Sequence, residues 1–281
     1  MQDFKDKVAV VTGAASGIGR GLAERFAAEG MRVVLADVEE PALHVAECEM
    51  REAGATVLAV RTDVSKAEDA QALAAKTVET FGAVHVVCNN AGVGSGGLSW
   101  EEPLEDWRWV LGVNLGGVIN GVRAFVPVML EGGEEGHIVN TASVAGLMPG
   151  AGAASYTASK FGIVGLSEAL YYELMMTSGG KIGVSVLCPA ATDTKIIDAD
   201  RNRPGGPLAP PAPGTPEAFG QDMVRQLLRA GQSPAQVAQQ VFDAIVEKRF
   251  YVLTHPEHNG VIRKRAEAMI AGGPPPAIGT A

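Results

Sequence analysis

The chain has 281 residues, of which 47% are hydrophobic and 20% charged, and its formal net charge is −9 at pH 7. This composition is that of a globular protein, and the acidic balance argues against a nucleic-acid-binding protein, because phosphate contacts need clustered Lys and Arg. The three cysteines are widely spaced without a CxxC pattern, which indicates a reducing compartment and no metal site. No apolar run approaches the roughly 20 residues that cross a bilayer, and the N-terminus lacks signal-peptide features, so we expect a cytoplasmic protein without a membrane partner.

Short β-branched runs alternate with longer helical patterns along nearly the whole chain. Strands are expected from Val8, Arg32, Thr56, Val84, His137, Ile182 and Phe250. The early strands are continuous apolar runs, as expected where both faces of a strand are covered. Between them lie segments with apolar residues at helical spacing. This alternation predicts an α/β fold in a single domain: a doubly wound, seven-stranded parallel sheet with helices on both faces, Rossmann-like in type.

Two segments break this rhythm. Residues 199–216 are rich in Pro and Gly and are not expected to form a regular element. They could be a domain linker, but too little chain follows for a second domain, so we interpret residues 190–230 as a substrate loop or lid. We therefore expect a dinucleotide-binding catalytic domain over residues 1–255, followed by a C-terminal helix and a flexible tail over residues 256–281.

The segment TGAASGIG, Thr12 to Gly19, directly follows the first expected strand and opens the first expected helix. Its glycines have the spacing G-x-x-x-G-x-G instead of the usual G-x-G-x-x-G. Residues without side chains let the backbone approach a pyrophosphate, and a helix N-terminus stabilises the negative charge. The segment predicts a dinucleotide-binding loop with contacts from Gly13, Ser16, Gly17, Ile18 and Gly19.

Asp37 closes the second expected strand. A carboxylate at this point of a βαβ unit can accept hydrogen bonds from the ribose hydroxyls of adenosine, and it would repel a 2′-phosphate. Position 38 is Val, so no Arg or Lys favours NADP there. An isolated Asp would be interpreted as a turn former, but this position favours NAD over NADP as the cofactor.

Tyr156 and Lys160 are four residues apart on an expected helix, so their side chains can share one face. A Tyr hydroxyl has an ordinary pKa of about 10 and is a poor base at neutral pH. A nearby ammonium group favours the phenolate and lowers that pKa, which makes proton transfer to or from a substrate oxygen feasible. By itself the spacing is common and carries no chemistry in most sequences.

Further motifs accompany the pair in chain order, namely TDV at 62–64, NNAG at 89–92, NLGG at 114–117, NTASVAG at 140–146 and YTASK at 156–160. Together with the glycine-rich loop, these motifs resemble those of the short-chain dehydrogenase/reductase family. The resemblance extends from Asp6 to about Thr254, nearly the whole chain.

The resemblance implies roles for four residues. Tyr156 would be the general acid/base, and Lys160 would lower the pKa of Tyr156 and bond the nicotinamide ribose. Ser143 would donate a hydrogen bond to the substrate oxygen. Asn114 would kink its helix and hold a water that links Lys160 to solvent. The resemblance also implies assembly through the helices bearing Asn114 and Tyr156, as a homotetramer or a dimer.

The resemblance also implies cofactor contacts beyond the glycine-rich loop and the catalytic pair. They fall at Asp63 and Val64 for adenine, at Asn90, Ala91 and Gly92 along the ribose, and at Pro189, Thr192 and Thr194 near the carboxamide. The last segment, PAATDT, departs from the family's P-G-x-aliphatic-x-T pattern, with Ala190 in place of Gly. Because the carboxamide contacts are mostly made by backbone, we expect binding to survive.

The strip from Val144 to Ala154 beside the expected site is almost wholly apolar or small and contains no Arg. It predicts a small hydrophobic alcohol or ketone as substrate. The expected function is reversible hydride transfer between NAD(H) and a hydrophobic secondary alcohol or ketone. Two alternatives are an NADPH-preferring carbonyl reductase of the same fold and, less favoured, a non-catalytic dinucleotide sensor.

Overall fold

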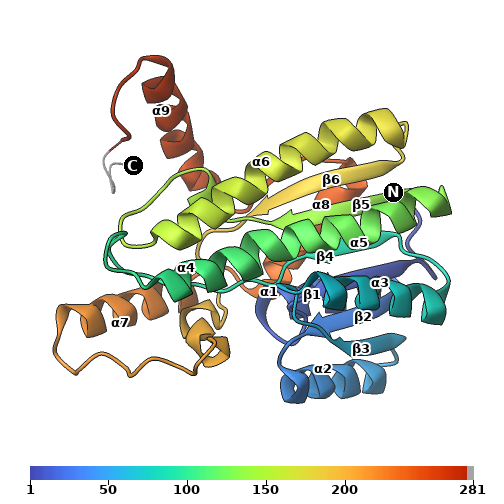
Figure 1. Ribbon diagram of the computed structural model, residues 1–281. Coiled ribbons are helices and arrows are strands. Elements are labelled where there is room, and N and C mark those ends of the chain that lie inside the picture. The colour runs from blue at the N-terminus through green and yellow to red at the C-terminus, as the bar shows by residue number, and fades with distance from the viewer. Residues whose placement is uncertain (277–281) are drawn as a thin grey trace.

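A computed structural model describes residues 1–276 and shows a twisted sheet between two layers of helices (Figure 1). The sheet has seven parallel strands in the order β3-β2-β1-β4-β5-β6-β7. The strands are β1 (Val8–Thr12), β2 (Arg32–Asp37), β3 (Val57–Arg61), β4 (Val86–Asn89), β5 (Gly136–Thr141), β6 (Ile182–Cys188) and β7 (Tyr251–Leu253). The doubly wound parallel sheet predicted from the alternating pattern is confirmed.

Helices cover both faces of the sheet. They are α1 (Gly17–Ala28), α2 (Glu40–Glu52), α3 (Ala67–Phe81), α4 (Leu104–Leu111), α5 (Gly117–Gly132), α6 (Ala154–Thr177), α7 (Pro216–Arg229), α8 (Pro234–Glu247) and α9 (Asn259–Ile270). Helices α1, α2 and α8 share one apolar core with the sheet, and α3, α5 and α6 share the other. Helix α9 projects from the body beside the start of α6 (Figure 1).

The two cores explain why the early strands are unbroken apolar runs in the sequence. Phe26 of α1 is fully buried on one side of the sheet, and Phe125 of α5 is buried on the other. Each such side chain contributes about 1.5–3 kcal/mol when it is removed from water. The strands between them are buried along their length, as in β1. The sheet and the helices packed on it, called the frame below, are therefore stabilised by a core on each face of the sheet.

The order of the strands reverses between β1 and β4, and this is where open α/β sheets bind ligands at the carboxyl ends of their strands. The Thr12 hydroxyl at the end of β1 accepts hydrogen bonds from the N–H groups of Asn90 and Ala91, at 2.9 and 3.0 Å. The loop after β4 is thereby tied to the start of the glycine-rich loop. Both predicted cofactor segments meet at this point.

Helices α4 and α5 are joined by a wide π-helical turn, η1 (Gly112–Gly116), which contains the buried Asn114. The continuous rod Leu104–Gly132 is long and apolar enough to cross a membrane by length and composition. This corrects the expectation that no such run exists. The rod packs against α3, α6 and the sheet, so it is a core helix of the fold.

The predicted lid contains more regular structure than its Pro and Gly content suggests. A 3-10 helix, η3 (Ile196–Asn202), and helix α7 lie within residues 190–230. The expectation that residues 199–216 form no regular element is thus wrong at both ends, since η3 runs to Asn202 and α7 begins at Pro216. Part of the predicted flexible tail, residues 277–281, lies outside the described residues.

Candidate active site

The glycine-rich loop is tightly packed against the loop after β4. Gly13 has a φ of 68°, a left-handed conformation that favours glycine. A Cβ atom on Gly19 would lie 2.1 Å from the carbonyl oxygen of Gly13. Ser16 is the N-cap of α1 without a side-chain cap, and Ile18 packs beside the core. The first N–H groups of α1 can thus bind an anion, and the loop fits a pyrophosphate.

Asp37 lies at the carboxyl end of β2 with its carboxylate held by backbone. One oxygen accepts from the N–H of Ala15 and the other from the N–H of Glu39, each at 3.0 Å. Burial raises the pKa of Asp37, and these backbone hydrogen bonds oppose that rise. Each carboxylate oxygen has a second lone pair, so the group can still accept from ribose hydroxyls.

The remaining predicted cofactor contacts line the same edge of the sheet. Asp63 accepts hydrogen bonds from both the N–H and the hydroxyl of Ser65, and Val64 packs against Gly117 of α5. A Cβ atom on Gly92 would lie 3.3 Å from Asn114 Oδ1 and 3.5 Å from Lys160 Nζ. Gly92 therefore lies between two of the predicted catalytic residues.

The segment after β6 crosses over the glycine-rich loop. The Pro189 carbonyl accepts hydrogen bonds from the N–H of Val144 and, at 3.4 Å, from the Ser143 hydroxyl. Thr192 is buried, and the Thr194 side chain lies 3.1 Å from where a Gly17 Cβ would be. These positions bring the predicted carboxamide contacts beside the pyrophosphate loop.

Asn114 is fully buried in the π turn, and its side chain makes three hydrogen bonds. Its Oδ1 accepts from the N–H of Val93 at 2.8 Å, and its Nδ2 donates to the Val93 carbonyl and to Ser159 Oγ, each at 3.0 Å. The distortion of the helix agrees with the predicted kink.

Tyr156 and Lys160 lie on the first turns of α6, with Lys160 Nζ 5.3 Å from the centre of the Tyr156 ring. Lys160 is buried and donates to the Thr141 carbonyl at 3.0 Å. Burial raises the pKa of Tyr156, and a hydrogen bond with Ser143 lowers it. Burial lowers the pKa of Lys160 to about 8. Burial thus raises the pKa of Tyr156 overall, and the expectation that Lys160 lowers this pKa stays a prediction.

Known proteins match this chain over its whole length. A profile of the short chain dehydrogenase family matches residues 7–204. The chain belongs to the short-chain dehydrogenase/reductase family. A crystal structure of a short-chain dehydrogenase/reductase from Burkholderia phymatum in complex with NAD is 46% identical, with a TM-score of 0.94 and full coverage of both chains.

Two curated relatives of this dehydrogenase/reductase are also similar to it over most of their length. The CLA biosynthesis dehydrogenase/reductase of Lactiplantibacillus plantarum is 36% identical over 98% of this chain and 97% of its own. The 1-deoxy-11-beta-hydroxypentalenate dehydrogenase of Streptomyces exfoliatus is 39% identical over 90% of this chain and 85% of its own. The chain is accordingly an oxidoreductase that acts on alcohols, of the nicotinamide-dependent dehydrogenase class.

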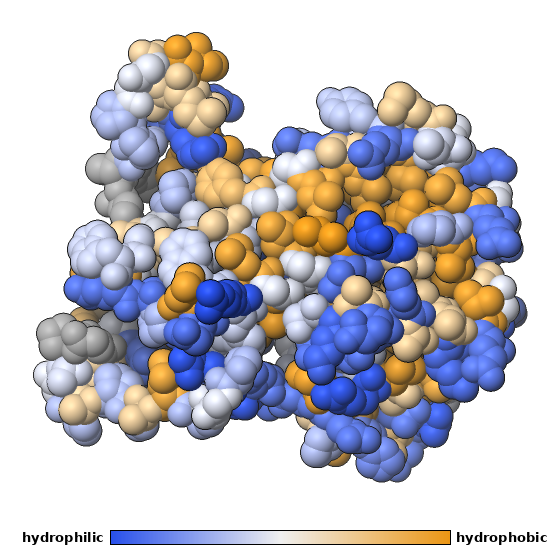
Figure 2. All heavy atoms as spheres, viewed as in Figure 1, coloured by the Kyte–Doolittle hydropathy of each residue, from blue (hydrophilic) through white to orange (hydrophobic). Residues whose placement is uncertain are grey.

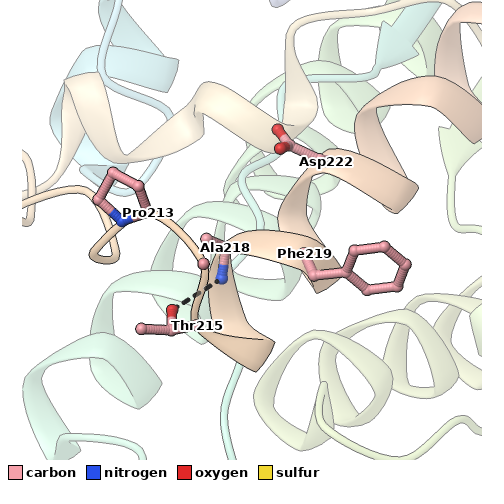
Figure 3. A pocket seen from close by; sticks show the side chains of 6 residues that line it. Pro213, Thr215, Ala218, Phe219 and Asp222 are labelled. Carbon is pink, nitrogen blue, oxygen red and sulfur yellow. Dashed lines mark hydrogen bonds between the residues drawn. The ribbon is translucent and has the colours of Figure 1, made fainter.

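Apolar side chains surround the Tyr156 ring in this dehydrogenase/reductase. Tyr156 and Trp109 pack against a small buried cluster of Val93, Val110 and Ala199. Ala199 belongs to η3, so the lid contributes to this cluster. A separate open hollow of about 510 Å³ lies in the outer part of the lid, lined by Pro213, Gly214, Thr215, Ala218, Phe219 and Asp222 (Figure 3). It contains none of the predicted catalytic residues, so we place the chemistry at Tyr156.

Several residues that organise the site were not singled out from the sequence. Thr12 and Ser159 stand inside the motifs TGAASGIG and YTASK, so their hydroxyls could have been considered. Glu102 has no such signal, although its carboxylate is buried and bonded to Ser155. His255 is half-buried, and its Nδ1 accepts from the Ala190 N–H at 3.4 Å.

Proposed function

We propose that this protein is an NAD-dependent dehydrogenase that reversibly oxidises a hydrophobic secondary alcohol, with Tyr156 as the general acid/base. The observation that carries the proposal is the meeting of Tyr156, Ser143, Lys160 and Asn114 beside the glycine-rich loop. A sensor that only binds the cofactor would have no need of a phenol bonded to Ser143. This argues against the non-catalytic alternative.

The loop and strand ends fit a nicotinamide dinucleotide. The close approach of Gly19 to Gly13, where a Cβ atom has no room, leaves backbone N–H groups accessible to a pyrophosphate. Asp37 would accept from the adenosine ribose and repel the 2′-phosphate of NADP. The homologue crystallised with NAD supports this preference.

The chain's own residues would handle the proton of the alcohol. The nicotinamide, when bound, supplies the hydride acceptor and, in its oxidised form, a positive charge. Tyr156 as phenolate would take the hydroxyl proton while the carbinol carbon gives up its hydride. The hydrogen bond that the Ser143 hydroxyl donates to the Pro189 carbonyl is long, at 3.4 Å, so its proton can turn to the substrate oxygen.

Lys160 would pass that proton onward. Its ammonium group bonds the Thr141 carbonyl and lies near the Tyr156 ring. With a pKa lowered to about 8, Lys160 gives up a proton more readily than an exposed lysine does. A water held at Asn114 would complete the route to solvent.

The substrate class follows from the apolar surroundings of Tyr156. Val93, Val110 and Ala199 offer no charged group to a carboxylate. The relative named 1-deoxy-11-beta-hydroxypentalenate dehydrogenase acts, by its name, on a compound with a hydroxyl group, which supports an alcohol as substrate. The lid over residues 190–230 would set the size of the substrate.

The surface supports assembly into a homo-oligomer. Figure 2 shows an apolar band over α5 and α6, where Ile119, Leu130, Tyr172 and Met176 are exposed. Contiguous apolar surface of this kind marks interaction sites in soluble proteins. A homotetramer or dimer through these helices, in the cytoplasm, is the arrangement that we propose.

Replacing Tyr156 tests the catalytic role. Tyr156→Phe removes the hydroxyl that carries the proton, so turnover of alcohols such as 1-phenylethanol or a 3-hydroxysteroid should fall about 10²–10⁴-fold. NADH binding, followed by fluorescence titration, should remain within about twofold. Turnover close to that of the wild type would overturn the proposal.

A second titration tests the cofactor preference. We expect NADH to bind more tightly than NADPH to the wild type, and Asp37→Ser to reduce that difference by removing the charge that repels the 2′-phosphate. Tighter binding of NADPH by the wild type would favour the carbonyl reductase alternative.

A further inference from the structure

A buried carboxylate is bonded to the residue before Tyr156. Ser155 Oγ donates to Glu102 Oε1 at 2.6 Å, a short charge-assisted hydrogen bond. Ser155 is fully buried and Glu102 is 8% exposed. The two residues lie far apart in the chain, so the bond joins the loop before α4 to the first turn of α6.

The start of α6 lacks a cap of its own. Its N-cap is Ala153, which offers no side-chain hydrogen bond, and the first turn contains no acidic residue. The first N–H groups of a helix have no partner within the helix, and the dipole favours a negative charge there. Glu102 brings such a charge to this end from another segment.

The loop that carries Glu102 is itself fixed to the chain before α6. Gly97 N donates to the Gly152 carbonyl at 2.9 Å, and Gly97 pairs with Ala153 as an isolated parallel bridge. The N–H of Glu102 donates to the Leu98 carbonyl at 3.0 Å. These bonds hold the carboxylate in place relative to Ser155.

Stability alone does not account for a glutamate at this position. Glu102 Oε2 is buried and has no hydrogen-bond partner among the described residues. A buried carboxylate oxygen without a partner costs free energy, and an apolar side chain of similar volume would avoid that cost. What the carboxylate provides is a fixed acceptor for the Ser155 hydroxyl, next to Tyr156.

We propose that Glu102 is a positioning residue for Tyr156 and acts through the Ser155 hydroxyl. The inference rests on the proposed role of Tyr156. Anchored in this way, the first turn of α6 presents the Tyr156 hydroxyl to Ser143. Loss of the anchor lets the turn shift, and displacements of an ångström at a reacting group reduce rates by up to about 10²-fold.

The test uses Ser155→Ala, Glu102→Ala and Glu102→Gln, with Glu105→Gln as the matched control because Glu105 is exposed and lies on the same segment. Ser155→Ala and Glu102→Ala should lower kcat for 1-phenylethanol about 10-fold and leave the Kd for NADH unchanged. Glu102→Gln keeps an acceptor for Ser155 and should retain most of the activity, as should Glu105→Gln.

Titration of Tyr156 provides a readout that does not depend on turnover. The chain has four tyrosines, so ¹³C-tyrosine labelling gives few NMR signals, and Tyr156→Phe assigns the one required. Because the bond with Ser143 lowers the pKa of Tyr156, Ser155→Ala should raise that pKa. If Glu102 acted only through its negative charge, Glu102→Gln would remove that charge and lower the pKa of Tyr156.

If Ser155→Ala keeps the wild-type pKa of Tyr156 and the wild-type kcat, the positioning role is overturned and the proposed function stays intact. Full activity of Tyr156→Phe would instead overturn the proposed function, whatever the titration of Tyr156 shows. If Glu102→Ala does not fold, Ser155→Ala, which removes only a hydroxyl, still decides the matter.

Discussion

The first turn of α6 and the lid are held in opposite ways. Around Tyr156, the anchors are buried hydrogen bonds, such as Lys160 to Thr141 and Ser155 to Glu102. The lid depends instead on ion pairs, and two of them are part-exposed: Arg201 with Glu39 at 2.6 Å and Arg225 with Asp198 at 2.7 Å. Helix α7 has no fully buried residue among those whose side chains are described.

This difference separates two requirements of a dehydrogenase. The acid/base group must keep its position to within a fraction of an ångström, which buried packing provides. The lid must admit and release the substrate, and part-exposed ion pairs contribute only about 0–1 kcal/mol each. Segments that open during turnover come from the least stable parts of a fold. We therefore expect substitutions in the frame to affect folding, and substitutions in the lid to affect substrate binding.

Gly19→Ala should have the largest effect, because its new Cβ would lie 2.1 Å from the Gly13 carbonyl oxygen and 2.6 Å from Asn90 Nδ2. Backbone cannot yield at this position, so we expect a loss of about 3 kcal/mol or more in unfolding free energy. NADH binding should be lost as well. Thermal denaturation and fluorescence titration measure both, and an unchanged melting temperature would contradict the tight packing of the loop.

Acid should destabilise the frame through His137 of β5. This buried imidazole bonds Ser185 at 2.8 Å, and burial lowers its pKa to about 3. As the pH falls, His137 takes up a proton near pH 6.5 in the unfolded chain but not in the folded protein. The free energy of unfolding therefore has its full value above about pH 6.5 and decreases as the pH falls from there towards about pH 3. The slope is about 1.4 kcal/mol per pH unit. Urea unfolding between pH 7 and about pH 5 measures it, and His137→Asn should flatten the slope.

Asp106→Asn should weaken lid closure. Asp106 is buried on α4 and pairs with Arg203 of the lid at 2.5 Å. Hydrogen bonds to charged groups are worth about 1.5–3 kcal/mol, so KM for the alcohol should rise about 10-fold while the Kd for NADH changes little. Asp222→Asn, in an exposed pair with Arg225, is the control and should leave KM unchanged. Equal effects of both substitutions would contradict a special role for the buried pair.

Gly220→Ala should have the smallest effect, a gain of about 0.5–1 kcal/mol in the stability of α7. Its Cβ atom would meet nothing within 4 Å, and Ala is the better helix former. Hydrogen exchange of the α7 amides should slow about threefold, whereas the melting temperature should stay constant if the lid opens independently of the frame. A parallel rise in melting temperature would show that the two regions unfold together.

Much of the frame could be predicted from the sequence, because strands buried on both faces leave unbroken apolar runs such as VAVVT. The cofactor edge could be predicted as well, since Gly13 to Gly19 and Asp37 are local signals next to strand ends. The catalytic roles came from a resemblance, because Tyr156 and Lys160 at helical spacing show only that they share a face.

The rest depends on contacts between distant parts of the chain. The pKa of Tyr156 rises because of burial, a property of the assembled fold that the spacing from Lys160 does not contain. The anchoring role of Glu102 depends on a loop brought against α6 from far away in the sequence. In the lid, η3 and α7 form although Pro and Gly surround them, since Thr215 caps α7 by accepting from the Ala218 N–H.

The π turn at Gly112–Gly116 also sets the rotational phase of two helices. An α-helix advances about 100° per residue, so one residue more or less in a continuous rod turns everything beyond it by that angle. With the wide turn in place, α4 directs Val110 to the Tyr156 cluster while α5 directs Phe125 to the sheet. A single-residue deletion in this turn would leave both helices intact and yet turn one of their two apolar faces to the wrong side.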